Sequence, residues 1–214
     1  MIAGDPVDWD DFFQQNLIPA ILSLILSTWD RMGKPGQTDS EPEISLRLSS
    51  ALINGKDRNR HPFLIRYEDV EVDTNLVKVT GRKDIVFFPT LHDEDIYFCL
   101  EAKRLNALAS GVRRSLADAY VKEGMQRFID GKYSRFVHHG GMLGYVLDGQ
   151  VDRAVRNVGT NIRTHVRELG MALPGRFLPS SVRPDDPSAK ETHHRRDQER
   201  ALFRIHHLFM KGGS

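Results

Sequence analysis

Apolar side chains recur at steps of three and four residues in several stretches of the chain, and this spacing is typical of one face of an α-helix. Residues 8–32 show it clearly, and residues 43–53 follow, with Ser40 as a candidate N-cap and acidic residues in the first turn. The pattern also predicts a long amphipathic helix over residues 115–133 and a further helix over residues 151–169.

A second pattern, rich in β-branched and aromatic residues and bounded by turn residues, predicts strands. Three such stretches, residues 62–72, 82–88 and 96–103, follow one another closely, so we expect an antiparallel meander. Residues 140–147 are predicted to form a further strand, whereas residues 201–210 fit either a strand or a helix.

The order of the predicted elements is a helix, three strands, a helix, a strand and a helix. This order indicates the α/β class, with a small mixed sheet flanked by helices. A length of 214 residues with 40% apolar side chains is enough for a single domain with a full core. We expect residues 1–38 to form an N-terminal helical extension, residues 41–150 the core, and residues 151–214 a C-terminal helix and tail.

The apolar pattern indicates that the chain has no membrane-spanning segment, and the cysteine content indicates its compartment. The longest apolar run, residues 17–29, is interrupted by Pro19 and is shorter than the about 20 residues that span a bilayer. The single cysteine, Cys99, excludes an intramolecular disulfide and fits a reducing compartment. We therefore expect a cytoplasmic protein with no membrane partner.

The net charge of +1 conceals a difference between the two halves of the chain. Residues 1–101 contain 10 Lys and Arg against 18 Asp and Glu, a charge of −8. Residues 102–214 contain 20 against 11, a charge of +9. A basic half of this kind fits a protein that binds a phosphate backbone, although a mixed, solvated surface would have the same composition.

The hairpin predicted from residue 82 to residue 103 brings charged side chains together. If it turns near His92 and Asp93, paired residue numbers sum to about 185, so Asp84 lies opposite Glu101 with Cβ atoms roughly 5 Å apart. Because side chains alternate along a strand, Lys103 lies on the same face as Glu101.

Two carboxylates that face each other repel unless a cation lies between them. Mg²⁺ prefers carboxylate oxygens, and a bound Mg²⁺ polarises phosphoryl oxygens and lowers the pKa of water. With the ammonium of Lys103 beside it, such a pair has the chemistry of a phosphodiesterase. The alternative is an ordinary ion pair at the ends of two strands, since Glu-x-Lys triplets also occur by chance.

The spacing of these residues resembles the PD-(D/E)XK nuclease superfamily. Asp84 matches the first acidic residue of the family, and the triplet from Glu101 to Lys103, which begins 17 residues later on an apolar strand, matches its E-x-K signature. The resemblance covers residues 41–150 and implies a restriction-endonuclease-like core in which Lys103 serves the attacking water. One departure is Lys83, which stands where the family often has proline.

The resemblance also implies a metal site for Mg²⁺ or Mn²⁺. Its ligands would be Asp84, Glu101 and the backbone carbonyl of Ala102. The helix before the strands often carries a glutamate that supports the metal or its water shell, and this residue is expected to be Glu43, with Glu41 as the substitute.

The helix after the E-x-K strand contributes further candidates. Gln126 and Tyr133, seven residues apart, are expected on one helix face, and several branches of the family have a Gln and a Tyr bordering the active site there. Equally, these two residues fit the ordinary polar, solvent-facing side of an amphipathic helix. Candidate phosphate contacts, or simply a solvated basic face, are Arg113, Arg114, Lys122, Arg127, Lys132 and Arg135.

These observations predict a metal-dependent nuclease that hydrolyses DNA. Since no separate target-recognition domain is apparent, we expect a nuclease subunit or effector of an antiviral defence or repair system, with partner subunits or a homodimer. Two alternatives remain: a catalytically inactive nuclease-fold module that mediates interactions, and an adaptor protein whose match to the motif is accidental.

Overall fold

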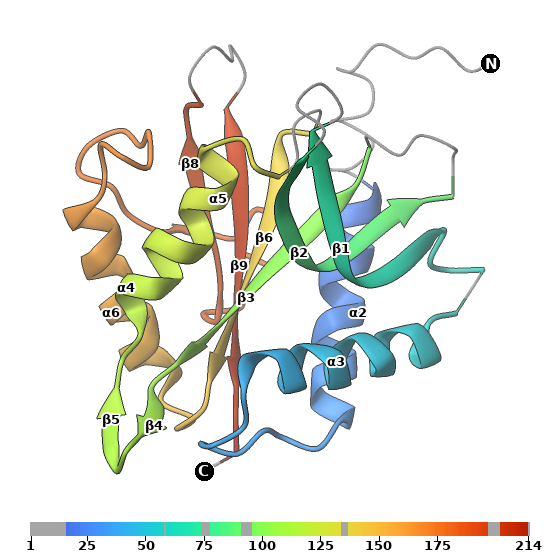
Figure 1. Cartoon of the computed structure of the whole chain (residues 1–214), viewed down its shortest axis with the longest axis horizontal. Helices are drawn as coiled ribbons and strands as arrows, with labels where there is room; N and C mark the ends of the chain where they lie inside the picture. Colours follow the sequence, from blue (N-terminus) through green and yellow to red (C-terminus); the bar gives the residue numbers. More distant parts are fainter. Residues whose placement is uncertain are drawn as a thin grey trace.

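A mixed sheet forms the centre of the molecule (Figure 1), and in the described residues it has seven strands. The structure is a computed structural model that describes residues 16–57, 59–73, 78–90, 96–133, 137–196 and 202–213. The strands are β1 (Phe63–Asp73), β2 (Lys78–Pro89), β3 (Phe98–Leu105), β6 (His139–Val146), β7 (Leu178–Pro179), β8 (Ala189–His194) and β9 (Phe203–Lys211). Their spatial order in the described part of the chain is β1-β2-β3-β6-β9-β8-β7. The α/β class is confirmed, but the sheet is larger than the four strands expected.

Helices cover both faces of this sheet. They are α2 (Ile18–Arg31), α3 (Glu41–Gly55), α4 (Ala117–Ala119), the π-helical turn η2 (Tyr120–Met125), α5 (Gln126–Ile129) and α6 (Val151–Thr164). Alternation along the strands builds two cores: Ile85 and Phe87 pack with α2 and α3, whereas Val86 and Cys99 pack with the helices from α4 to α6. None of the described helices combines the length and apolar character that a bilayer crossing needs.

The predicted meander of β1, β2 and β3 is present, with antiparallel pairing throughout. β6 then runs parallel to β3, and β9 runs parallel to β6. β6 is buried along its whole length because it lies in the middle of the sheet and is covered on both faces. β3, which carries the E-x-K triplet, therefore lies between an antiparallel and a parallel neighbour. A separate two-stranded sheet, β4 (Ala107–Ala109) with β5 (Val112–Arg114), follows it.

Several predicted boundaries differ from the structure. The helix predicted over residues 115–133 ends at Ile129, because the chain turns at Gly131, where φ is +67°. The helix predicted over residues 8–32 is seen from Ile18 onward as α2, and its residues before 16 lie outside the described part. The undecided segment at residues 201–210 is the strand β9.

Strand β8 escaped prediction because its sequence is polar, yet most of it is buried. Hydrogen bonds satisfy this polarity: Thr192 Oγ1 of β8 is joined at 2.8 Å to His207 of β9, which is also joined to the Tyr120 hydroxyl at 2.9 Å. His194 is joined to Thr192 Oγ1 and to the Leu169 carbonyl, both at 2.7 Å. Burial lowers the pKa of both His194 and His207, so these two histidines are neutral in the folded protein.

Acidification is therefore expected to destabilise the protein through its buried histidines. Burial lowers the pKa of both His194 and His206 to about 4. Since these folded-state values lie below the unfolded value of about 6.5, stability is lost as pH falls from about 6.5 towards 4, by about 3 kcal/mol for each histidine. Urea unfolding at pH 7, 5.5 and 4.5 measures this loss. His206→Asn should flatten the pH dependence, while His61→Asn, in the loop before β1, should leave it unchanged; equal slopes in both variants would contradict the assignment.

Candidate active site

Strands β2 and β3 pair in the register expected from the sequence. Ile85 lies opposite Leu100, and Val86 lies opposite Cys99. One step further along, the backbone amide of Ala102 donates a hydrogen bond of 2.7 Å to Asp84 Oδ2. Asp84 and Glu101 are thus held at neighbouring positions on adjacent strands.

The N-terminus of α3 contributes a third carboxylate to this place. The paired positions of β2 and β3 end at Ile85 and Leu100, so the next part of β3 has polar groups to satisfy on that side. Glu41, the first residue of α3, meets this need: its Oε2 accepts the Arg104 amide at 3.0 Å, and its Oε1 accepts Lys103 Nζ at 3.0 Å. α3 is thereby fixed to the strand that carries the E-x-K triplet.

The ammonium of Lys103 lies among three oxygens. Besides Glu41, it donates to Glu101 Oε1 at 2.8 Å and to the Ala102 carbonyl at 3.0 Å. Burial by itself would lower the pKa of Lys103, but the carboxylates of Glu101 and Glu41 together hold this pKa above its usual value. Lys103 is consequently a cation at neutral pH.

A second cation reaches Glu101 from α5. Arg127 Nη1 lies 3.0 Å from Glu101 Oε1 and 3.1 Å from Oε2. The same nitrogen donates to the Tyr133 hydroxyl at 2.9 Å, and this hydroxyl donates to the carbonyl of Arg82 on β2. We call the group formed by Glu41, Asp84, Glu101, Lys103 and Arg127 the β3 cluster.

Two residues expected at the site lie outside the β3 cluster. The carboxylate of Glu43 forms a capping box with Ser40, accepting hydrogen bonds from both its amide and its hydroxyl. Glu41 lies two positions earlier and so projects from a different side of the helix, which is why it contacts Lys103 and Glu43 does not. The side chain of Gln126 donates instead to Asp130 Oδ1 at 2.8 Å.

The π-helical turn η2 explains why Arg127, and not Gln126 as expected, lies beside Glu101. A π-helical turn takes up an extra residue, so the residues after it are displaced around the helix axis by about one position. Arg127 then faces Glu101, and Gln126 faces the segment after α6, where it also approaches the Glu168 carbonyl at 3.4 Å. The sequence contains no signal that separates Arg127 from the other basic residues of this helix.

Tyr133 joins the site through Arg127, although it does not share a helix face with Gln126. It follows the end of α5, and its ring packs so closely on Gly81 of β2 that an added Cβ there would lie 2.7 Å from the ring. Burial, followed by the charge of Glu101, raises the pKa of Tyr133. The tyrosine is therefore a neutral hydroxyl that positions the guanidinium.

The two carboxylates of the strands are electrostatically unfavourable as they stand. Burial, and after it the charge of Asp84, raises the pKa of Glu101 to about 7, and Lys103 and Arg127 offset this only in part. Burial also raises the pKa of Asp84, although the hydrogen bond from the Ala102 amide opposes this shift. Such a pair gains stability from any further positive charge that reaches it.

The oxygens of the β3 cluster fit a hard divalent cation. Asp84, Glu101 and the Ala102 carbonyl offer only oxygen atoms, which are the ligands that Mg²⁺ and Mn²⁺ prefer. Glu101 and the Ala102 carbonyl already hold a cation together, the ammonium of Lys103. Within the described ranges no three His, Cys, Asp or Glu side chains are arranged to hold a metal ion, so a metal here would rely on the carbonyl and on water as well as on the two carboxylates.

A glycine allows η2 to lie directly on β3 and β6. A Cβ added to Gly124 would lie 2.5 Å from Met142 Cε and 3.5 Å from Lys103 Cγ. The close approach lets the helix cover the aliphatic part of Lys103, so only the ammonium end of this side chain reaches the carboxylates. η2 thus positions both cations of the β3 cluster.

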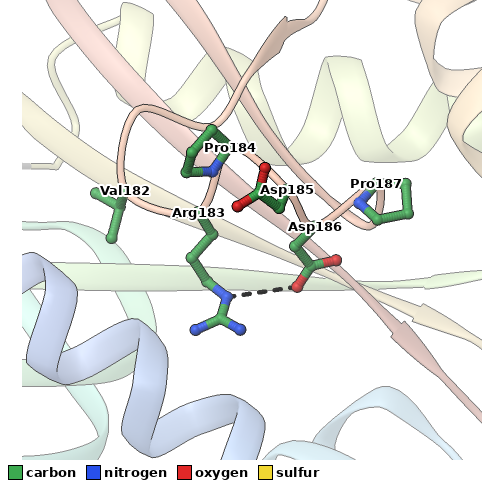
Figure 2. A pocket seen from close by; sticks show the side chains of 6 residues that line it. All are labelled: Val182, Arg183, Pro184, Asp185, Asp186 and Pro187. Atoms are coloured by element: carbon green, nitrogen blue, oxygen red, sulfur yellow. Dashed lines mark hydrogen bonds and ion pairs between the residues drawn. The ribbon is translucent and has the colours of Figure 1, made fainter.

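The β3 cluster does not coincide with the surface hollow shown in Figure 2. That hollow is lined by the loop from Val182 to Pro187, in which Arg183 Nε donates to Asp186 Oδ2 at 3.4 Å. The loop connects β7 and β8, at the opposite end of the strand order from β2.

Comparisons of the chain with models of protein families, with curated proteins and with solved structures gave no match.

Proposed function

We propose that this chain is a metal-dependent nuclease of the PD-(D/E)XK kind, which hydrolyses phosphodiester bonds of DNA. The observation that carries the proposal is the joining of Asp84, Glu101 and Lys103 at one end of the β2 and β3 pairing. The order of α3, the β1 to β3 meander, the helix from α4 to α5 and then β6 also agrees with the core that the resemblance implies. A place in a defence or repair system stays a prediction from the sequence.

Asp84, Glu101 and the Ala102 carbonyl would hold Mg²⁺ or Mn²⁺. When bound there, the metal ion would polarise a phosphoryl oxygen and lower the pKa of a coordinated water. It would also offset the burial, and the repulsion from Asp84, that together raise the pKa of Glu101 to about 7.

The protein's own cations have separate tasks in this proposal. Lys103, kept protonated by Glu101 and Glu41, donates hydrogen bonds to the attacking water or to a phosphate oxygen. Glu41 is a positioning residue, because it ties Lys103 and the Arg104 amide to α3. Arg127 has a side chain that is 38% exposed, so its guanidinium can pair with a phosphate that approaches Glu101.

Cleavage of supercoiled plasmid tests the proposed function, with Mg²⁺ or with excess EDTA. We expect nicked or linear product only with the metal ion. Glu41→Gln and Glu43→Gln make a matched pair, since both are in the first turn of α3 and each removes one charge. Glu41→Gln should slow cleavage roughly 10- to 100-fold by releasing Lys103, and Glu43→Gln should keep the wild-type rate.

Two results would contradict the proposal. One is a wild-type protein that cleaves neither plasmid nor single-stranded DNA at any Mg²⁺ or Mn²⁺ concentration, which would favour the inactive interaction module. The other is cleavage that persists in EDTA and is equal in both variants, since it would have to come from a different site or from a contaminant.

A further inference from the structure

A small β-ribbon continues β3 beyond the β3 cluster. β4 and β5 pair antiparallel and are joined by Ser110 and Gly111 alone. Both of these residues have positive φ, 50° and 75°, which is the geometry of the tightest hairpin turns and matches the twist of the strands. The ribbon projects from the body of the molecule at the lower left of Figure 1.

Buried polar contacts fix the base of the β4–β5 ribbon. Asn106, between β3 and β4, has a left-handed backbone with φ of 54°, and its side-chain amide donates to Asp148 Oδ1 at 2.9 Å. Its backbone amide donates to the Ser115 carbonyl across the base. Asp148 Oδ2 also lies 3.5 Å from Arg113 and 3.2 Å from Arg153. The direction of the ribbon relative to Lys103 is therefore set before any partner binds.

The outer part of the β4–β5 ribbon is both basic and apolar. All three residues of β5 are exposed, and Val112 has 60% of its surface open to solvent. The segment from Ala107 to Arg114 contains two arginines and no acidic residue. Side-chain alternation puts Val112 and Arg114 on one face of the ribbon and Arg113 on the other, towards Asp148. An exposed valine beside arginine on a projecting ribbon suits a partner that is anionic outside and apolar within.

We propose that the β4–β5 ribbon enters the major groove of a DNA duplex beside the phosphate that is cut, so that the substrate is double-stranded; this rests on the proposed nuclease function. The major groove of B-DNA is about 12 Å wide and admits a two-stranded β-ribbon. Arg114 then contacts base edges or phosphates, and Val112 contacts the floor of the groove, where the thymine methyl groups are apolar. Arg113, held by Asp148, faces the phosphates at the groove edge.

The position of the ribbon sets the length of duplex that it reaches. Ser110 at the tip lies seven positions after Lys103, so at about 3.3 Å per residue the tip lies at most roughly 23 Å from the backbone of Lys103. This distance corresponds to about seven base pairs of 3.4 Å rise. The ribbon therefore requires duplex on one side of the cut, within one helical turn.

The same geometry discriminates between nucleic acids. The major groove of an RNA duplex is deep and too narrow for protein side chains to read, and a single strand has no groove. The contribution of Val112 and Arg114 is consequently confined to duplex DNA, whereas general attraction by the basic half of the chain would act on all three ligands.

Binding measurements on an inactivated protein test the ribbon. Asp84→Asn protein with Mg²⁺ is titrated by fluorescence anisotropy against duplex DNA, the single strand and an RNA duplex of equal length. Adding Val112→Ser with Arg114→Ala should weaken binding of duplex DNA about 10- to 100-fold and leave the other two affinities within about twofold. Arg183→Ala, which removes the same charge at the loop in Figure 2, is the matched control and should bind like the parent.

The possible outcomes distinguish a failure of the proposal for the ribbon from a failure of the proposed nuclease function. Both changed side chains are exposed, and thermal melting checks that the double variant folds. An unchanged duplex affinity, or an equal loss for all three nucleic acids, overturns the proposal for the ribbon even if the wild type cleaves plasmid. Loss confined to duplex DNA supports the ribbon, and a wild type that binds duplex in this way without cutting it overturns the nuclease instead. Shortening the duplex on either side in turn should weaken binding from one side only.

Discussion

Replacing Lys103 by methionine is expected to lower the rate of plasmid cleavage by about 10²- to 10⁴-fold while strengthening the binding of Mn²⁺. The rate falls because methionine cannot donate a hydrogen bond to the attacking water or to the phosphate. The metal affinity rises because, in the wild type, the Lys103 ammonium occupies the Glu101 and Ala102 oxygens that the metal ion requires, and methionine leaves them open. A contact between partly buried charges is worth a few kcal/mol, so the affinity for Mn²⁺ should rise about tenfold or more.

Mn²⁺ binding is best measured without DNA by titration calorimetry at pH 8.5, where Glu101 is ionised even though its pKa is raised. Lys190→Met, on β8 at the far side of the sheet, removes the same charge and should change neither the rate nor the affinity. A Lys103→Met protein that cleaves at the wild-type rate would contradict the proposed function. Weaker Mn²⁺ binding would show that Lys103 supports the metal ion and does not compete with it.

Replacing Glu101 by glutamine is expected to abolish cleavage and to remove a loss of stability at neutral to alkaline pH. The pKa of Glu101 is raised from 4.5 to about 7 in the folded protein. A carboxyl group of this kind stabilises the fold below about pH 4.5, and this contribution is lost as pH rises through 7, by about 3 kcal/mol. Bound Mg²⁺ should restore the stability above pH 7, because it binds the ionised carboxylate of the folded state.

Urea unfolding between pH 5.5 and 8.5, with EDTA or with Mg²⁺, measures this effect. The difference in unfolding free energy between wild type and Glu101→Gln isolates Glu101 from the buried histidines, which act in both proteins. Glu43→Gln is the control, because this exposed carboxylate titrates below the range tested. If the wild type and Glu101→Gln lose stability in parallel above pH 7, and Mg²⁺ stabilises neither, then Glu101 is not the metal ligand proposed.

The local patterns of the sequence were sufficient for the β2 and β3 hairpin. Side chains on a strand alternate and antiparallel neighbours keep a constant sum of residue numbers, so the placement of Asp84 beside Glu101 depends only on where the turn lies. The helix that begins after Ser40 is likewise a local structure, fixed by its cap and by its apolar spacing. Short-range geometry of this kind leaves the choice of partners across the molecule open.

Those partners account for the two expected site residues that lie outside the β3 cluster. Glu41 and Glu43 are both acidic residues in the first turn of one helix, and only the docking of α3 against β3 decides that Glu41 meets Lys103. Similarly, Gln126 and Arg127 are adjacent, and the π-helical turn before them decides which one faces Glu101. This π-helical turn contains Gly124, which packs closely on Met142, and the turn leaves no periodic signal in the sequence.

The sequence by itself determined the α/β class, the meander, and the proximity of Asp84, Glu101 and Lys103, because each follows from the period of a strand or helix. Only the tertiary structure decided that the sheet has seven strands in the described residues, since β8 is polar and Thr192 on it is hydrogen-bonded to His207 of β9, which in turn is bonded to Tyr120. It also brought Glu41 to Lys103 and Arg127 to Glu101, across 62 and 26 positions of the chain respectively. Contacts at such separations arise from the packing of whole elements, which the local alternation of apolar and polar residues does not specify.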